Sequence, residues 1–244
     1  SCATLARQAR LAFIELDQAE AELGDLAGRE VGEIVIGAMP LSRSHVLPRA
    51  IGAFRRRRPN LSLKLLEGTY DELLGGLRRG EIDLLIGALR FPAPIDDIAQ
   101  ERLFDDTLVI LAGGGHPLRR SPVTPGRLCD FPFLVPRRGT PTRSQFDAMF
   151  EVRGLAPPPS IIETGSVLMM REMVQDGHHL ACISRAQAEG EIARAIVQVL
   201  DFTVPGPPRP IGITTRAGWQ PTPAQALLCE EIRISVVQTT AAIA

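Results

Sequence analysis

Arginines with the chemistry to bind an organic anion follow short apolar runs of this sequence. Arg43 and Arg90 follow such runs in the first half, and Arg137 and Arg138 follow the run Phe133–Val135 in the second. A guanidinium can bind a carboxylate through two parallel N–H bonds, and each charge-assisted bond contributes ~1.5–3 kcal/mol. The sequence therefore predicts a cationic site for a small organic anion, such as an aromatic or aliphatic carboxylate.

Two glutamates leave other interpretations open. Glu67 and Glu163 also follow apolar runs. They could neutralise the arginines, or they could accept hydrogen bonds from the hydroxyls of a sugar-like ligand. In a third interpretation, the arginines are tied in salt bridges across two lobes and bind no ligand.

Catalytic and metal-binding patterns are absent from the sequence. It contains no G-x-S-x-G, H-E-x-x-H, Walker or G-x-G-x-x-G motif. The four histidines lack metal-ligand spacing with a cysteine or carboxylate, and the four cysteines are far apart, which favours reduced thiols. We therefore expect no catalytic residue, no metal and no cofactor, and no enzymatic activity.

Three local motifs have a simple structural interpretation and a functional one. Gly113-Gly-Gly-His116 is expected to be a loop and not a phosphate cradle, because prolines follow it where a helix would have to begin. The run Arg55–Arg58 is expected to be a solvated helix end, since no aromatic residues interleave it. His178 and His179 are expected at a turn near the ligand, either exposed or in contact with it.

Composition limits the class of protein. The 244 residues have 45% hydrophobic content and a net charge of −1, so no global field attracts the chain to nucleic acid or to an anionic membrane. No apolar run reaches the ~20 residues of a membrane span, and no signal peptide is recognisable. A cytoplasmic protein with no membrane partner is expected.

The positions of the apolar runs predict parallel β-α-β units. Strands are expected at Ile34–Ile36, Leu61–Leu66 and Leu84–Ile86, with helices at Ser42–Arg58 and Asp71–Arg79 between them. Gly80 suits a left-handed helix end. The loops that follow parallel strands fall at one edge of the sheet, where open α/β sheets bind ligands.

Several stretches of this sequence resemble one known family. The runs GEIVIGA from Gly32, LPRAIGAFRRRRPN from Leu47, GEIDLLIG from Gly80 and TLVILAGGGHPL from Thr107 are similar to the effector-binding domain of LysR-type transcriptional regulators. The resemblance covers about residues 1 to 235. It implies an α/β fold with two Rossmann-like lobes joined by two crossover strands, like periplasmic binding proteins, with the ligand between the lobes.

The expected organisation follows from the two crossovers. Residues 1–30 form a linker helix, residues 31–100 and 208–244 form lobe I, and residues 101–207 form lobe II. Leu5, Ala9, Ala12, Leu16, Ala19, Leu23 and Leu26 follow a heptad seam that suits helix pairing. The alternative is an amphipathic helix packed on its own domain. No winged-helix segment precedes it, so the chain is expected to be a fragment cut within the linker helix.

The resemblance also implies the site residues. The effector contacts expected in lobe I are Met39, Leu41, Ser42, Arg43, Thr69, Leu89 and Arg90, with a helix N-terminus near Ser42 facing the anion. Those expected in lobe II are Pro136, Arg137, Arg138, Glu163, Thr164, Gly165 and Ser166. The residues expected at a dimer interface are Ile51, Phe54, Arg55, Met170, Met173 and Val174.

Three functions remain after this reading. The first is the effector-sensing domain of a bacterial transcriptional regulator, which forms a dimer or tetramer and reaches DNA only through the missing winged helix. The second is a solute-binding protein of a transport system with the same fold. The third is an enzyme on this scaffold, which no acid–base pair or nucleophile supports.

Overall fold

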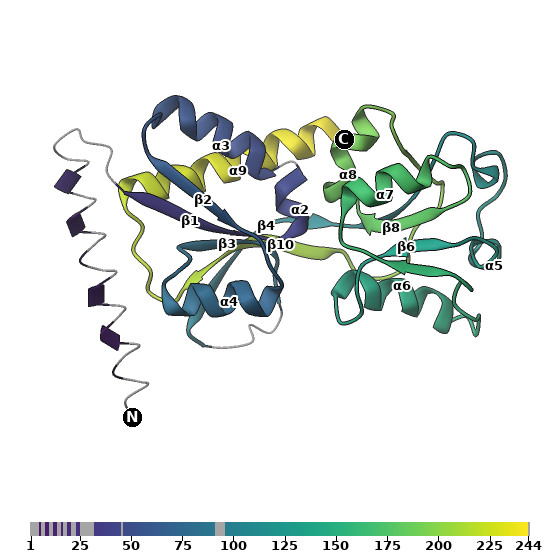
Figure 1. The fold of residues 1–244 in the computed structure, drawn as a ribbon, viewed down its shortest axis with the longest axis horizontal. Coiled ribbons are helices and arrows are strands. Elements are labelled where there is room, and N and C mark those ends of the chain that lie inside the picture. The colour runs from purple at the N-terminus through teal and green to yellow at the C-terminus, as the bar shows by residue number, and fades with distance from the viewer. Residues whose placement is uncertain are drawn as a thin grey trace. The chain divides into compact units, whose positions relative to one another are not determined.

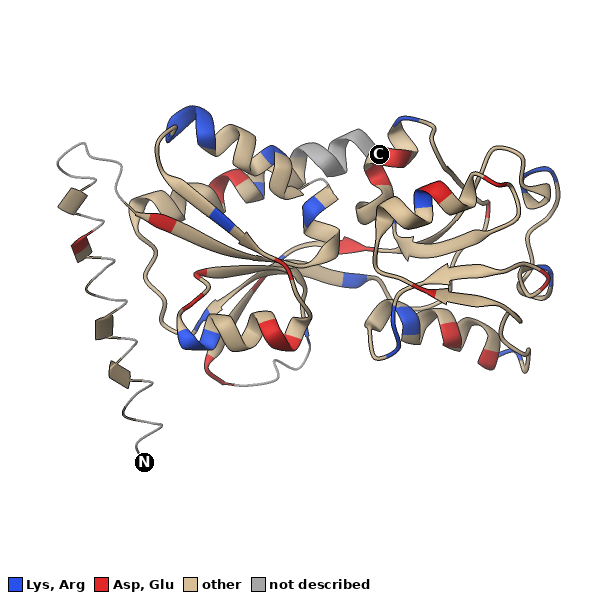
Figure 2. Cartoon of the chain, viewed as in Figure 1, with Lys and Arg blue, Asp and Glu red and all other residues tan. Residues whose placement is uncertain are grey.

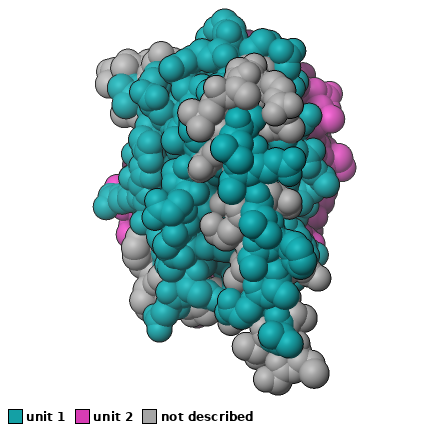
Figure 3. Space-filling view, turned by 90° about the vertical axis from the view of Figure 1, so that its left-hand side faces the viewer, with its two compact units in different colours: residues 1–104, 210–244 teal, residues 105–209 magenta. Residues whose placement is uncertain are grey.

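A computed structural model of the chain describes residues 32–44, 46–90 and 96–243, with side chains through Val237. Before these it describes residues 5, 8, 9, 12, 13, 16, 19, 20, 23 and 24. The chain forms two compact units (Figure 3). Unit 1 comprises Ser1–Phe104 and Pro210–Ala244, and unit 2 comprises Asp105–Arg209. The unit boundaries therefore follow Phe104 and Arg209, where the sequence placed them after residues 100 and 207.

Unit 1 is built on a five-stranded sheet of order β2-β1-β3-β10-β4. The strands are β1 (Glu33–Ala38), β2 (Ser62–Leu66), β3 (Leu84–Ala88), β4 (Ile98–Asp106) and β10 (Arg209–Arg216). Strand β1 pairs in parallel with β2 and β3, whereas β10 runs antiparallel to β3. The carboxyl ends of β1, β2 and β3 consequently lie at one edge.

Helices cover both faces of this sheet (Figure 1). Successive strand residues point to opposite faces, so Ile34 and Ile36 pack in the core with α3 (Val46–Arg57) and α9 (Pro223–Ile243). Val35 and Leu85 pack on the other face with α4 (Tyr70–Arg79). A short helix, α2 (Pro40–Ser44), follows β1. Burial on both faces explains why β1 and β3 are nearly continuous apolar runs, whereas the edge strand β2 is more exposed.

Unit 2 is built on a second five-stranded sheet of order β7-β6-β8-β5-β9. Its strands are β5 (Leu108–Ala112), β6 (Phe133–Val135), β7 (Ile161–Glu163), β8 (Leu180–Ser184) and β9 (Gln198–Val199). Strands β6, β7 and β8 are parallel, and β5 is antiparallel to β8. One face packs on α6 (Pro141–Glu151), and the other packs on α7 (Val167–Val174) and α8 (Arg185–Ala193).

Most predicted elements are confirmed within a few residues, and the differences have local causes. Gly80 ends α4 in the left-handed conformation, with φ 75°. The sequence predicts a helix at Ser144–Arg153, and α6 begins three residues earlier, at Pro141, because Thr140 accepts a hydrogen bond from the Arg143 N–H and caps it. The sequence also predicts a strand at Ile196–Phe202, where β9 has two residues, and it missed α8, whose apolar residues follow no clear helical period.

Two other elements differ from the sequence prediction. The expected helix Ser42–Arg58 is two helices, α2 and α3, of which α2 begins at Pro40. A 3₁₀ turn at Pro117–Arg120 directly follows the glycine loop, where no helix was expected, because His116 caps it through Nδ1.

The predicted heptad seam is partly described. Leu5, Leu16 and Leu23 are each helical and are 73%, 64% and 66% exposed, so they are not buried on their own unit. Ala9, Ala12 and Ala19 of the same seam are also helical and exposed, whereas Leu26 lies outside the described residues. None of the described helices is both long enough and apolar enough to span a membrane.

Close strand packing in unit 1 generates a stability prediction. A Cβ atom added at Gly212 in β10 would lie 1.8 Å from the backbone oxygen of Glu101 in β4. Gly212→Ala should therefore lower the free energy of unfolding by about 1–3 kcal/mol, because the two strands must separate to admit the methyl group. Gly126→Ala is the matched control, since nothing lies within 4 Å of its added Cβ. Equal urea midpoints for the two variants would contradict this packing.

Candidate functional site

The segment after β1 is the short helix α2, which directs two of its side chains into unit 1. Leu41 is 6% exposed and Ser42 is 0% exposed. The Ser42 hydroxyl and its N–H both donate to the Met39 carbonyl, at 2.8 and 3.0 Å. Both donors of Ser42 are therefore used within the segment, and the anion contact expected at this helix N-terminus stays a prediction.

Arg43 is the charged residue of the same segment, and it forms an ion pair with Glu67 after β2. The side chains are 31% and 63% exposed. Solvent weakens such a pair, but the glutamate still compensates the charge of the arginine. The salt-bridge interpretation thus holds for Arg43, although the pair lies within unit 1 and does not join two lobes.

The remaining predicted residues of unit 1 also have local roles. Thr69 caps α4 in a capping box with Glu72. Leu89 is 6% exposed, so its side chain offers little surface to a ligand. The Arg90 guanidinium lies 4.5 Å from the centre of the Tyr70 ring, a cation–π contact. Burial raises the pKa of Tyr70, assisted by Asp71 and opposed by Arg90.

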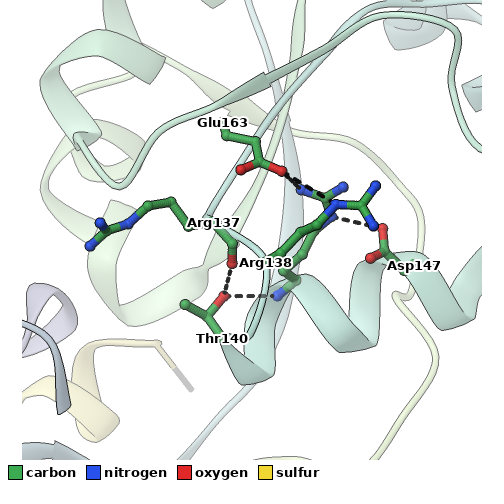
Figure 4. A network of polar contacts seen from close by, with 6 residues as sticks. Arg137, Arg138, Thr140, Asp147 and Glu163 are labelled. Carbon is green, nitrogen blue, oxygen red and sulfur yellow. Dashed lines mark hydrogen bonds and ion pairs between the residues drawn. The ribbon is translucent and has the colours of Figure 1, made fainter. Parts of the chain in front are cut away.

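In unit 2, a charged network joins the loops after β6 and β7 (Figure 4). Glu163 at the end of β7 accepts a hydrogen bond from Arg143 at 2.6 Å and pairs with Arg138 at 3.7 Å. Both contacts use Oε1 of the glutamate. Arg143 also donates to Asp147 at 2.8 Å. Two arginines therefore hold one carboxylate at this edge of the sheet.

Arg143 is the residue of this network that the sequence prediction missed. Its side chain is only 3% exposed. Burial acts to lower its pKa, but the hydrogen bonds to Asp147 and Glu163 outweigh burial and raise it. Its spacing of four residues from Asp147 on one helix was a visible signal of an ion pair. Its contact with Glu163 depends on the packing of α6 against β7.

Arg137 differs from the other predicted arginines. Its side chain is exposed and points away from the network, with no hydrogen-bond or ion-pair partner among the described residues. Its carbonyl accepts a hydrogen bond from the Thr140 hydroxyl at 2.8 Å, which fixes the loop backbone. The neighbouring Pro136 is half-buried. An exposed cation on an ordered loop is available to an anion.

The loop after β7 supplies smaller polar groups. Thr164 accepts a hydrogen bond from the Ser166 N–H at 3.1 Å, and Ser166 caps α7 by accepting from Met169 at 3.2 Å. Gly165 between them is exposed. The structure thus brings together, at one edge of the unit 2 sheet, the residues predicted for this unit.

His178 and His179 lie at the opposite edge of the unit 2 sheet. They precede β8, and β8 runs parallel to β6 with Leu180 opposite Phe133. The loops Pro136–Arg138 and Glu163–Ser166 instead follow their strands. Asp176 accepts from both histidine N–H groups and from the His179 ring. The prediction that these imidazoles lie near the ligand loops is therefore wrong.

The turn of His178 and His179 contains a charged carboxylate, Asp176, and the loop after β5 contains a buried imidazole, His116. Although burial acts to raise it, the pKa of Asp176 falls to about 2 because of the hydrogen bonds from His178 and His179. His116 is 1% exposed and stacks on Phe131 with ring centres 4.5 Å apart. Burial lowers the pKa of His116 below its ordinary 6.5. The described residues contain no cluster of three or more metal-ligating side chains.

The arginine run at the end of α3 is seen as a blue stretch of the helix in Figure 2. Arg55 donates to the carbonyls of Pro59 and Leu61, both at 2.8 Å. Arg57 pairs with Glu231 of α9 at 3.1 Å. These contacts secure the helix end and support the structural interpretation of the run.

The predicted dimer residues fall into two groups. Phe54 is 0% exposed in the unit 1 core, and Met170 and Val174 are 1% and 0% exposed in the unit 2 core. These three side chains stabilise their own units and have no surface for a partner. Ile51 and Met173 are half-buried, and Arg55 is exposed.

A cavity of about 360 Å³ lies elsewhere in unit 1, between β4, β10 and α9. Glu101 and Arg233 line it and pair through two hydrogen bonds of 2.6 and 2.8 Å. Their charges compensate each other, and the cavity is separate from the loops that follow β1, β2 and β3.

Two α/β units joined by two chain crossings, with polar loops at the carboxyl ends of the parallel strands, define the periplasmic-binding-protein-like fold of regulator effector domains. The cofactor-binding domain of the Cbl transcriptional regulator superposes with a TM-score of 0.71, at 23% identity over 86% of this chain and 92% of that one. The benzoate-bound BenM effector domain gives a TM-score of 0.67, at 23% identity over 85% and 93%.

Sequence comparison gives the family. Residues 27–236 match the model of the LysR substrate binding domain, and the chain belongs to this family. It is 33% identical over 224 residues to the HTH-type transcriptional regulator GalR of Pseudomonas putida, covering 92% of this chain and 56% of that protein. It is 26% identical over 232 residues to PcaQ of Agrobacterium fabrum, covering 93% and 73%. The chain thus spans little more than half of GalR.

The buried imidazole of His116 generates a pH prediction. Because its folded pKa is lowered, its contribution to stability is fully present above about pH 6.5 and is lost as the pH falls through the folded pKa. His116→Asn removes this titration and leaves an oxygen that can accept from Leu118 N–H as His116 Nδ1 does. Urea unfolding from pH 8 to 5 should show a steeper loss for the wild type. Parallel losses in both proteins would contradict the assignment.

Proposed function

We propose that this chain is the effector-sensing part of a LysR-type transcriptional regulator. Effector binding would change how a DNA-binding part of the same protein binds DNA. Family membership supports the proposal, and the named sequence relatives are transcriptional regulators, which favours regulation over solute transport. The proposal places the protein in the bacterial cytoplasm, where the DNA lies. It assigns no reaction to the chain.

The uncompensated charge of Arg137 is the observation from which we infer the chemical class of the ligand. Arg43 pairs with Glu67, and Arg138 and Arg143 share Glu163, so these cations are largely neutralised. Arg137 has no such partner among the described residues and can bind one carboxylate. The proposed effector is therefore an organic acid with a single carboxylate.

Glu163 adds a second requirement for the ligand. Its ion pairs use Oε1, and Oε2 has no partner among the described residues. A carboxylate oxygen accepts hydrogen bonds from hydroxyl groups but repels a second carboxylate. A hydroxylated monocarboxylate satisfies both Arg137 and Glu163, whereas a dicarboxylate brings a charge that nothing compensates.

Regulation would follow from differential binding. An effector shifts a conformational equilibrium only by the difference between its affinities for the two states. We propose that carboxylate binding at the loops of unit 2 favours one conformation of the regulator and so changes its binding to DNA.

A thermal-shift screen tests the proposed site. The panel contains benzoate, 3-hydroxybenzoate, gluconate, succinate and glucose. Stabilisation by a ligand grows with the ratio of its free concentration to its Kd. We expect 3-hydroxybenzoate or gluconate to raise Tm in a titratable manner, and Arg137→Ala to weaken that binding by roughly tenfold or more because a charge-assisted contact is lost.

Arg120→Ala is the matched control, since Arg120 is another exposed arginine of unit 2 that lies outside these loops. Its binding should equal that of the wild type. Binding that is indifferent to Arg137, or that succinate achieves as well as the hydroxylated acids, would refute the proposed site.

Self-association is also proposed, on an exposed surface of α7. Leu168 and Met169 are 59% and 46% exposed, although the same helix buries Met170. Exposed large apolar side chains next to each other mark an interaction surface. Together with the exposed leucines of the first 23 residues, they favour a homodimer or tetramer in the complete protein.

Leu168→Asp should therefore weaken association by at least tenfold, because a charge would be buried at the interface. Analytical ultracentrifugation over a concentration series measures this change. Val152→Asp is the control, because Val152 is 74% exposed at the end of α6, outside α7. If both variants sediment like the wild type, α7 is not the interface.

A further inference from the structure

One acidic residue and one basic residue lie at the points where the chain crosses between its units. Strand β4 enters unit 2 after Phe104, and Asp106 is its last residue. The chain returns to unit 1 after Arg209, which is the first residue of β10. Asp106 and Arg209 form an ion pair, with side chains 1% and 12% exposed. One buried contact therefore joins both crossings, 103 residues apart in the sequence.

Asp106 also holds the beginning of α8. Its Oδ1 accepts a hydrogen bond from the Ala186 N–H at 3.1 Å, while its Oδ2 receives Arg209. The adjacent Thr107 carbonyl accepts from the Arg185 N–H at 2.9 Å. The first crossing is thereby attached to the helix that follows β8.

Arg209 holds the beginning of α6 in the same way. A second nitrogen of its guanidinium donates to the hydroxyl of Thr142, whose residue is 7% exposed. One turn along the helix, Gln145 donates to the Pro205 carbonyl at 3.0 Å, just before the second crossing. The first two turns of α6 thus contact the second crossing at two points.

The first turn of α6 is also the end of the Arg137 loop. Thr140 caps the helix and donates to the Arg137 carbonyl at 2.8 Å. Only Pro141 lies between this cap and Thr142. A shift of the Arg137 loop would consequently move the hydroxyl to which Arg209 donates.

A buried ion pair is a poor means of stabilising a fold, because the desolvation of both charges offsets their attraction. A planar guanidinium with fixed donors is instead well suited to hold two partners in one geometry. We infer that Arg209 is a positioning residue, which through Thr142 and Asp106 transmits a displacement of the Arg137 loop to both chain crossings. The regulatory meaning of this junction rests on the proposed function.

The experiment perturbs the loop by mutation and needs no effector. Thr140→Val removes the cap of α6 and should accelerate amide hydrogen exchange in the first turn of the helix by about fivefold. Through Arg209 it should also accelerate exchange at Ile211, Gly212 and Ile213 in β10. In a Thr142→Val background, which removes the acceptor of Arg209 with little change of shape, Thr140→Val should still loosen α6 but leave these three amides unchanged.

Two controls separate coupling from general destabilisation. Thr124→Val removes the equivalent cap of α5 (Pro125–Leu128), which is a short helix before β6, and should leave the three β10 amides unchanged. Thr142→Ser keeps the hydroxyl and should restore the response to Thr140→Val. Loss of this rescue would overturn the inference.

The inference is also overturned if Thr140→Val changes the β10 amides equally in both backgrounds, or changes them in neither. The exchange experiment contains no carboxylate, so its result does not depend on the outcome of the ligand screen. A negative exchange result would likewise not contradict ligand binding at Arg137.

Discussion

Parallel strands that are buried on both faces constrain this molecule more than any single contact. Each such strand must be followed by a helix that covers a face of the sheet, so every loop after a strand emerges at the same edge. In unit 1 this constraint gathers the loops after β1, β2 and β3, and in unit 2 those after β6 and β7. It also places His178 and His179, which precede β8, at the far edge.

Charge compensation then decides which of the gathered residues are free to act. Arg43 forms an ion pair with Glu67, and Arg138 and Arg143 both pair with Glu163. Helices α4, α6 and α7 are capped by Thr69, Thr140 and Ser166. Arg137 remains as an exposed cation, and Thr140 fixes the backbone of its loop by donating a hydrogen bond to the Arg137 carbonyl.

The two crossings connect this site to the rest of the chain. Both units are α/β layers with separate cores, and the chain passes from one unit to the other at two places. Asp106 and Arg209 occupy those places, and α6 begins on one of them. The helix that follows the Arg137 loop therefore also contacts a crossing.

The sequence by itself determined the elements of the fold and the edge of each sheet that carries the candidate loops. Apolar period, prolines and the glycine after α4 are local signals, and they placed most strands and helices within a few residues. They also identified the loops of Arg43, Arg137 and Glu163. They missed α8 and placed α6 late, where local signals are weak.

The tertiary structure decided which of these polar side chains are free. Arg143 and Glu163 are 20 residues apart, and Arg209 lies 67 residues from Thr142 and 103 from Asp106. The burial of Phe54, Met170 and Val174, which removed them from a dimer surface, is likewise a result of packing. Contacts between residues so far apart in the sequence depend on how the helices pack against their sheets, and no local pattern of residues encodes them.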